Sequence, residues 1–185
     1  LGGDGANRAV AKGHGSVPIL PISTGTNNVF PTMIEGTIGG LAAGLVARKL
    51  VSIEEGTVSY TKLEVILDRE VVDLALVDAV VYDDVFVASR AIWDMTKVRQ
   101  IFLNRAEPDN IGLSSIGGLI HPIAPAQPRG LCLEIGGNSR PVLAPVAPGM
   151  IKKVFIKSRQ VMKPGEEIPI GLSPSVLALD GEREV

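Results

Sequence analysis

Four residues near the start of the chain, Gly2-Gly3-Asp4-Gly5, combine three glycines with one carboxylate. Glycine lets a backbone come close to a bulky anionic ligand, and an acid beside that backbone can accept a proton or bind a cation. A helix that begins directly after this segment would point its N–H groups at a phosphate group. A strand-to-helix turn with an aspartate cap uses the same residue types. The segment therefore predicts either a phosphate-binding turn with a functional acid or a capped helix start.

A second polar segment occupies residues 21–28 and reads Pro-Ile-Ser-Thr-Gly-Thr-Asn-Asn. Its hydroxyl and amide groups offer many neutral donors and acceptors to a nucleotide. A turn held by bonds between side chains and backbone would need the same residues. The candidate nucleotide-binding residues in the two segments are Gly2, Gly3, Gly5, Asn7, Ser23, Thr24, Gly25, Thr26, Asn27 and Asn28.

Two further groups of acids follow apolar runs. Asp83 and Asp84 come after one run, and Asp180-Gly181-Glu182 comes after another near the end of the chain. A solvated strand end and a hairpin turn with charged flanks are the structural alternatives for these groups. The two histidines, His14 and His121, have no metal-ligand spacing, and no Gly-x-Ser-x-Gly is present. We therefore expect neither a zinc site nor a serine nucleophile.

The elements that must position these residues fall into two parts, with a boundary expected near Leu50–Gly56. Residues 1–50 predict an α/β segment. In this part we expect a helix at Asn7–Lys12, a short strand at Val17–Ile22 and a helix from about Met33 to Lys49.

The second of these helices is predicted from two patterns. Thr32 stands three residues before Glu35, which is the spacing of a capping box at a helix start. Apolar residues then recur at helical steps, at Ile34, Ile38, Leu41 and Leu45. A stripe of glycines on the same helix indicates close packing against a sheet, at Gly36, Gly40 and Gly44.

Residues 51–185 predict a β-rich domain, an antiparallel sandwich of short strands separated by glycine and proline turns. The alternation of apolar and charged residues begins near Leu63–Asp68. The further expected strands are Val71–Tyr82, Val85–Ser89, Gly130–Ile135, Lys152–Lys157, Ile168–Leu172 and Val176–Leu179.

The composition excludes several classes of partner. The 185 residues hold 18 basic and 20 acidic side chains, so the net charge of −2 gives no field for nucleic acid or an anionic membrane. No apolar run reaches the roughly 18 residues of a membrane span. Cys132 is the single cysteine, which rules out an intramolecular disulfide and fits a cytoplasmic protein. Because the sequence begins without Met inside a motif, we expect it to be part of a longer protein.

The sequence resembles the NAD kinase and diacylglycerol kinase superfamily at its paired motifs, and it is most similar there to the ATP-NAD/AcoX-like kinases. The specific motifs are Gly-Gly-Asp-Gly-x-Asn and the segment at residues 21–28. Weaker similarities follow in the family's order along nearly the whole chain, at Asp83-Asp84, Leu113–Pro122, Leu143-Ala144-Pro145 and Leu179–Glu182.

The resemblance implies a kinase that uses ATP and Mg²⁺, with NAD or a related nucleotide as the phosphate acceptor. Residues 1–50 would be the end of a Rossmann-like nucleotide-binding domain, and residues 51–185 would complete the cleft. It also implies a homo-oligomer. Asp4 would be the catalytic general base or magnesium-linked carboxylate at the acceptor hydroxyl. Glu182 would assist proton transfer, and Asp83 and Asp84 would bind the acceptor nucleotide.

Two departures from the family pattern keep other functions open. Ala6 replaces a threonine, and the Thr-Gly-Ser-Thr-Ala-Tyr segment of NAD kinases is absent before Leu113. A lipid kinase with a diacylglycerol-like acceptor is one alternative. A nucleotide sensor without turnover is the other.

Overall fold

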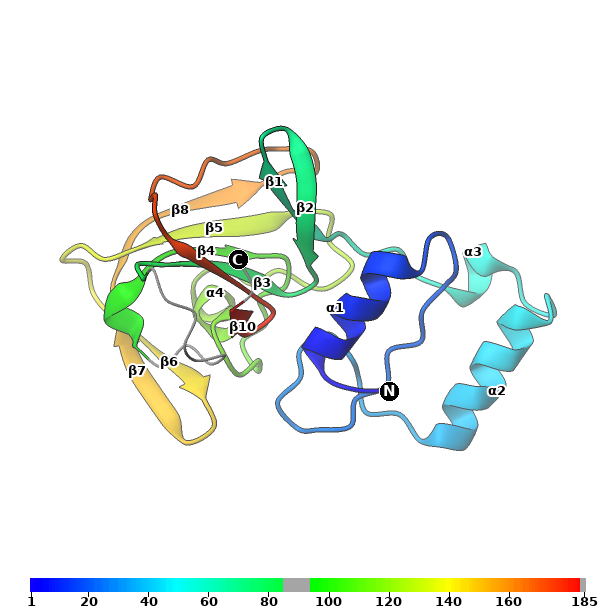
Figure 1. Ribbon diagram of the computed structural model, residues 1–185. Coiled ribbons are helices and arrows are strands. Elements are labelled where there is room, and N and C mark those ends of the chain that lie inside the picture. Colours follow the sequence, from blue (N-terminus) through cyan, green and yellow to red (C-terminus); the bar gives the residue numbers. More distant parts are fainter. Residues whose placement is uncertain (85–93, 184–185) are drawn as a thin grey trace.

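The computed structural model describes residues 1–84 and 94–183, and in Figure 1 a helical part lies beside a larger β-rich part. The predicted strand at Val85–Ser89 lies outside the described residues. Among the described residues, no helix is long and apolar enough to cross a membrane.

The helical part contains α1 (Asp4–Gly13), α2 (Gly36–Ala47) and the short α3 (Ile53–Gly56). The predicted helix at Asn7–Lys12 is confirmed as α1, which begins three residues earlier. The predicted strand at Val17–Ile22 is replaced by one parallel bridge between Ile22 and Thr32. Ser23 N–H donates to the carbonyl of Thr32 over 2.9 Å and closes this bridge.

The start of α2 differs from the predicted capping box. Glu35 is itself the N-cap, and its carboxylate accepts the N–H of Ile38 over 3.0 Å. Thr32 does not cap the helix, because it lies three residues before the N-cap and pairs with Ile22 in the bridge. A glutamate side chain has therefore taken the position that short polar side chains usually hold.

The predicted packing faces of α2 are also wrong. Gly39 is the buried glycine, and a Cβ there would lie 3.1 Å from Ile22 Cδ1. The apolar face is open, since Ile38 and Leu41 are each 63% exposed. Nothing described lies within 4 Å of the Cβ positions of the predicted glycine stripe at Gly36, Gly40 and Gly44.

The β-rich part is built from antiparallel pairs. A six-stranded sheet has the order β10-β9-β3-β4-β5-β8, and two two-stranded sheets, β1-β2 and β6-β7, accompany it. The strands are β1 (Leu63–Leu67), β2 (Glu70–Ala75), β3 (Asp78–Tyr82), β4 (Val98–Leu103), β5 (Gly130–Ile135), β6 (Val142–Ala147), β7 (Met150–Val154), β8 (Ile156–Met162), β9 (Val176–Leu179) and β10 (Glu182–Arg183). A 3₁₀ turn, Met95–Lys97, precedes β4, and α4 (Ser114–Ile120) follows it.

Both faces of the sheet are buried at its central strand β3, whose successive side chains point to opposite faces. On β3, Val80 and Tyr82 belong to one apolar cluster, whereas Ala79 and Val81 belong to the other. The first cluster includes side chains of α4, β6 and β7. The second cluster packs against side chains of β1.

The strand predictions are confirmed where short apolar runs end at turns. β5 and β9 have the predicted bounds, and β1 lies where the alternation begins. The run at Val71–Tyr82 divides into β2 and β3, and Lys152–Lys157 divides between β7 and β8. No strand forms at Ile168–Leu172, and β4, β6 and α4 were not predicted.

Gly118 of α4 provides a test of this packing. A Cβ at this position would lie 2.2 Å from the carbonyl oxygen of Glu107, which is rigid backbone. We expect Gly118→Ala to lower the free energy of unfolding by about 1–3 kcal/mol, measured by urea denaturation. Gly40→Ala is the matched control, because nothing lies within 4 Å of its Cβ. It should raise the free energy by about 0.5–1 kcal/mol, and equal effects of the two would contradict the packing described.

Candidate functional site

The two polar segments singled out in the sequence meet through Asp4. The Asp4 carboxylate accepts the N–H of Phe30 over 2.7 Å and the N–H of Val29 over 3.0 and 3.1 Å. Gly2 N–H donates to the carbonyl of Ile22 over 3.0 Å. A Cβ at Gly3 would lie 2.8 Å from Asn28 Oδ1, so a larger residue there would displace the Asn28 side chain. The chain after the second segment is thus fixed to the start of α1.

Most polar groups of these segments bond to one another. Asn28 Nδ2 donates to Ser23 Oγ over 2.7 Å, and Ser23 Oγ donates to the carbonyl of Gly25 over 2.7 Å. Asn7 is buried, and its Nδ2 donates to the carbonyl of Gly3 over 2.8 Å. These contacts are the ones expected if the segment at residues 21–28 is a turn held by bonds between side chains and backbone. Thr24, Thr26 and Asn27 are exposed.

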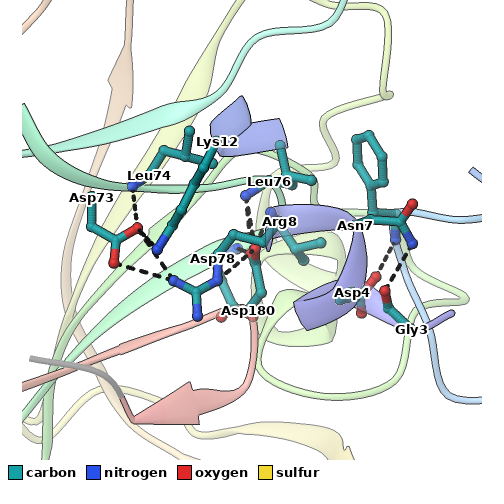
Figure 2. Close-up of polar contacts among 12 residues, drawn as sticks. Gly3, Asp4, Asn7, Arg8, Lys12, Asp73, Leu74, Leu76, Asp78 and Asp180 are labelled. Atoms are coloured by element: carbon teal, nitrogen blue, oxygen red, sulfur yellow. Dashed lines mark hydrogen bonds and ion pairs between the residues drawn. The ribbon is translucent and has the colours of Figure 1, made fainter. Parts of the chain in front are cut away.

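Asp180 connects three elements of the chain. Its carboxylate accepts the N–H of Leu76, Val77 and Asp78 over 2.7–3.2 Å, at the turn between β2 and β3. Its Oδ2 lies 3.8 Å from Nε of Arg8 on α1. Figure 2 shows Arg8 between Asp180 and the Asp73 carboxylate of β2, which lies 3.3 Å from Arg8 Nη1. α1 is thereby attached to the β-rich part.

The turn that carries Asp180 has the geometry of a two-residue hairpin. Asp180 and Gly181 have φ angles of 50° and 80°, and Leu179 pairs with Glu182 across the turn. An Asp-Gly pair with two positive φ angles is typical of type I′ hairpins. Asp180-Gly181-Glu182 therefore forms the hairpin turn that was its structural alternative. The turn also directs the Asp180 carboxylate toward the β2-β3 turn.

Asp78, which sequence reasoning missed, is the first residue of β3. It is 6% exposed, and its Oδ1 has no hydrogen-bond partner among the described residues. Burial, together with the nearby charges of Asp180 and Asp4, raises the pKa of Asp78 to about 8, whereas a bond from Gly181 N–H lowers it. The signal in the sequence was an acid inside the apolar run at residues 74–82.

Asp4, Asp78 and Asp180 line one cavity of about 180 Å³ between the two parts. Asn27 and Val29 reach it from the helical part, and the β-rich part supplies the remaining walls. Burial raises the pKa of Asp4, and burial raises the pKa of Asp180 to about 6. Sites for whole drug-sized ligands measure roughly 300–1,000 Å³, so this cavity accommodates a phosphate or hydroxyl end of a ligand.

The other predicted acids lie elsewhere or are partly described. Asp83 and Asp84 follow the opposite end of β3 from Asp78, about 15 Å away at strand spacing. Their carboxylates pair with Arg99 over 2.6 Å and with Lys97 over 3.0 Å. The structure does not bring them to the cavity. Glu182 lies in β10, but its side chain is outside the described part.

Arg105, at the end of β4, holds the loop after the second segment. Its guanidinium lies 4.5 Å from the ring centre of Phe30 and 4.7 Å from that of Tyr60. Nη1 donates to the carbonyl of Phe30 over 3.4 Å. Stacked arginines of this kind contribute through packing as well as charge. Arg105 therefore fixes the backbone that in turn fixes Asp4.

The described residues include no group of three His, Cys, Asp or Glu side chains placed to hold a metal ion. Mg²⁺ usually binds one or two carboxylates together with water and substrate phosphates. Three backbone bonds reach the Asp4 carboxylate, and only one of them reaches Oδ2. Asp4 can therefore serve as a single protein ligand for Mg²⁺ that arrives with a phosphate.

Comparison with known proteins identifies the family. The profile described as "Acetoin catabolism protein X C-terminal domain" matches residues 61–185. The chain is also 38% identical over 194 residues to "Acetoin catabolism protein X" of Cupriavidus necator, covering 100% of the chain and 54% of that protein. The chain belongs to the acetoin catabolism protein X family. It spans about half the length of the relative it matches. No solved structure matches.

In this chain, the match to the C-terminal domain of the acetoin catabolism protein X family begins at residue 61. It contains Asp78 and Asp180, whereas Asp4 and the second polar segment precede it. The described cavity therefore combines side chains from within and outside the family's C-terminal domain.

The buried acids predict an unusual dependence of stability on pH. Asp78 and Asp180 bind protons more tightly when folded, with pKa values of about 8 and about 6 against an ordinary 3.8. Their contribution is complete below pH about 4 and is lost as pH rises through these values. We expect the free energy of unfolding to fall between about pH 4 and 8, by up to about 1.4 kcal/mol per pH unit for each of the two groups.

Asp78→Asn tests the cause of this dependence, because the amide cannot ionise. Urea denaturation at several pH values should show a much smaller fall above about pH 6.5 in this variant. The same slope in both proteins would show that another group is responsible.

Proposed function

We propose that the chain is part of an ATP-dependent kinase that transfers phosphate to a hydroxyl of NAD or a related nucleotide. The observation that carries this proposal is the position of Asp4. It stands in the Gly-Gly-Asp-Gly turn at the start of α1 and lines a cavity between the two parts of the chain. The reaction itself is inferred from the resemblance to NAD kinases, because the name of the family does not specify a reaction.

The acceptor hydroxyl oxygen bonds to the γ-phosphorus of ATP, the bond from that phosphorus to the bridging oxygen breaks, and ADP leaves. The hydroxyl proton passes to the Asp4 carboxylate, whose Oδ2 receives one backbone bond and keeps room for it. Mg²⁺ bound with ATP would neutralise phosphate charge.

Asp4 suits this role for two physical reasons. Its bonds from Val29 and Phe30 hold the carboxylate in one orientation, and phosphoryl transfer depends mainly on alignment. Burial raises its pKa, which brings the group closer to the range of an effective general base. The small cavity would receive the reacting ends of the substrates, with the rest of each nucleotide outside it.

A lipid kinase would need an apolar channel that opens at Asp4. The large apolar groove of the described chain has about 700 Å³ and lies between residues 17–20 and the helices α2 and α3. It shares no lining residue with the Asp4 cavity, so it does not favour a lipid acceptor. The sensor alternative is favoured by the bonds that already occupy Asp4. It predicts nucleotide binding without turnover.

The test measures NADP formation from NAD, ATP and Mg²⁺ by this chain and, in parallel, by the full-length relative from Cupriavidus necator. Asp4→Asn should lower the rate of this chain by about 100-fold or more. Asp68→Asn is the matched control, because Asp68 is exposed in the β1-β2 turn and its positive φ of 52° suits asparagine.

Folding is checked on the same samples by circular dichroism, since Asp4→Asn disturbs backbone bonds worth about 1–3 kcal/mol. Full activity of the folded Asp4→Asn variant would refute the assigned role. If nucleotides bind and neither protein forms NADP, the acceptor is wrong or the chain is a sensor.

A further inference from the structure

Asp78 is a buried acid in an otherwise apolar strand, and one of its two carboxyl oxygens has no hydrogen-bond partner among the described residues. One bond reaches it from Gly181 N–H, and Oδ1 has no partner among the described residues. Most buried polar atoms in proteins have a hydrogen-bond partner, and leaving one without a partner is unfavourable. Because Asp78 also lines the cavity, a ligand there can supply the missing partner.

The charges around Asp78 determine its form. The carboxylates of Asp180, on the β9-β10 turn, and Asp4, on α1, both oppose its ionisation. Arg8 of α1 lies beside Asp180 and Asp73, and Arg105 after β4 interacts with Asp4 and Asp180. Neither arginine is among the groups that favour ionisation of Asp78.

We propose that Asp78 holds a proton at neutral pH and donates a hydrogen bond from Oδ1 to a phosphate oxygen of a ligand in this cavity. The inference rests on the proposed function for the class of ligand. A neutral acid removes one negative charge from a cavity lined by three carboxyl groups, and it presents a donor in its place. An unprotonated phosphate oxygen, which accepts but does not donate, is the matching group. A pKa of about 8 keeps most of Asp78 protonated at pH 7.

The first measurement does not need a substrate to turn over. The side-chain carboxyl carbon of Asp78 is followed by NMR in the ¹³C-aspartate-labelled chain, assigned with Asp78→Asn. We expect it to titrate near pH 8 and to shift on addition of inorganic phosphate, or of ATP with Mg²⁺, at pH 7. Titration near pH 4, or no shift with any of these probes, would overturn the inference.

The second measurement compares binding of ATP with Mg²⁺ by calorimetry in variants. Asp78→Asn keeps a donor at the same place and should bind within about threefold of the wild type at pH 7. Asp78→Ala removes the donor and should bind at least about tenfold more weakly. Asp68→Asn in the exposed β1-β2 turn is the control.

The pH profile separates a proton donor from a merely structural acid. Wild-type affinity should fall by about tenfold between about pH 7 and 9 as Asp78 loses its proton, and Asp78→Asn should not show this fall. Parallel profiles would overturn the inference, as would loss of binding in a folded Asp78→Asn variant. If phosphate shifts Asp78 but no NADP forms, the proposed function fails and this inference stands.

Discussion

Three parts of the chain meet at the carboxylate of Asp180, which accepts backbone N–H groups from Leu76 to Asp78 and lies beside Arg8 of α1. Asp180 is 8% exposed, and a buried carboxylate is tolerated only when hydrogen bonds and cations compensate for lost hydration. One side chain therefore joins the β2-β3 turn to the β9-β10 hairpin. It also supports α1, which pairs with Asp73 as well. Removing it would leave the three N–H groups without this acceptor and would take away one of the two carboxylates beside Arg8.

The cavity is a consequence of this arrangement and of a second one like it. Asp4 fixes the backbone at Val29 and Phe30, and the stacked Arg105 holds that backbone against the end of β4. The Asp4 and Asp180 carboxylates accept several backbone N–H groups, whereas Oδ1 of Asp78, which lines the same cavity, has no partner among the described residues. The packing that brings Asp4 and Asp180 to this cavity also buries Asp78. This burial and the two nearby charges raise the pKa of Asp78.

Sequence reasoning succeeded where local pattern decides the outcome. Runs such as Gly130–Ile135 and Val176–Leu179 end at turn residues and became β5 and β9 with those bounds. The start of α2 was mispredicted because the bridge at Thr32 is a contact between distant residues. Asp4 was found from its glycine context, but Asp78 has no motif. The burial and the charges around Asp78 come from α1 and the β9-β10 turn, which are distant from it in sequence. A local sequence pattern therefore does not predict them.

Amide hydrogen exchange tests the central claim most directly, namely that Asp180 binds the N–H groups of the β2-β3 turn. We predict slow exchange at Leu76, Val77 and Asp78 in the wild-type chain, and a selective loss of protection there in Asp180→Ala, which removes the acceptor oxygens. Protection at β5 should remain, which separates local opening from global unfolding. Rapid exchange at these three amides in the folded wild-type chain would contradict the account.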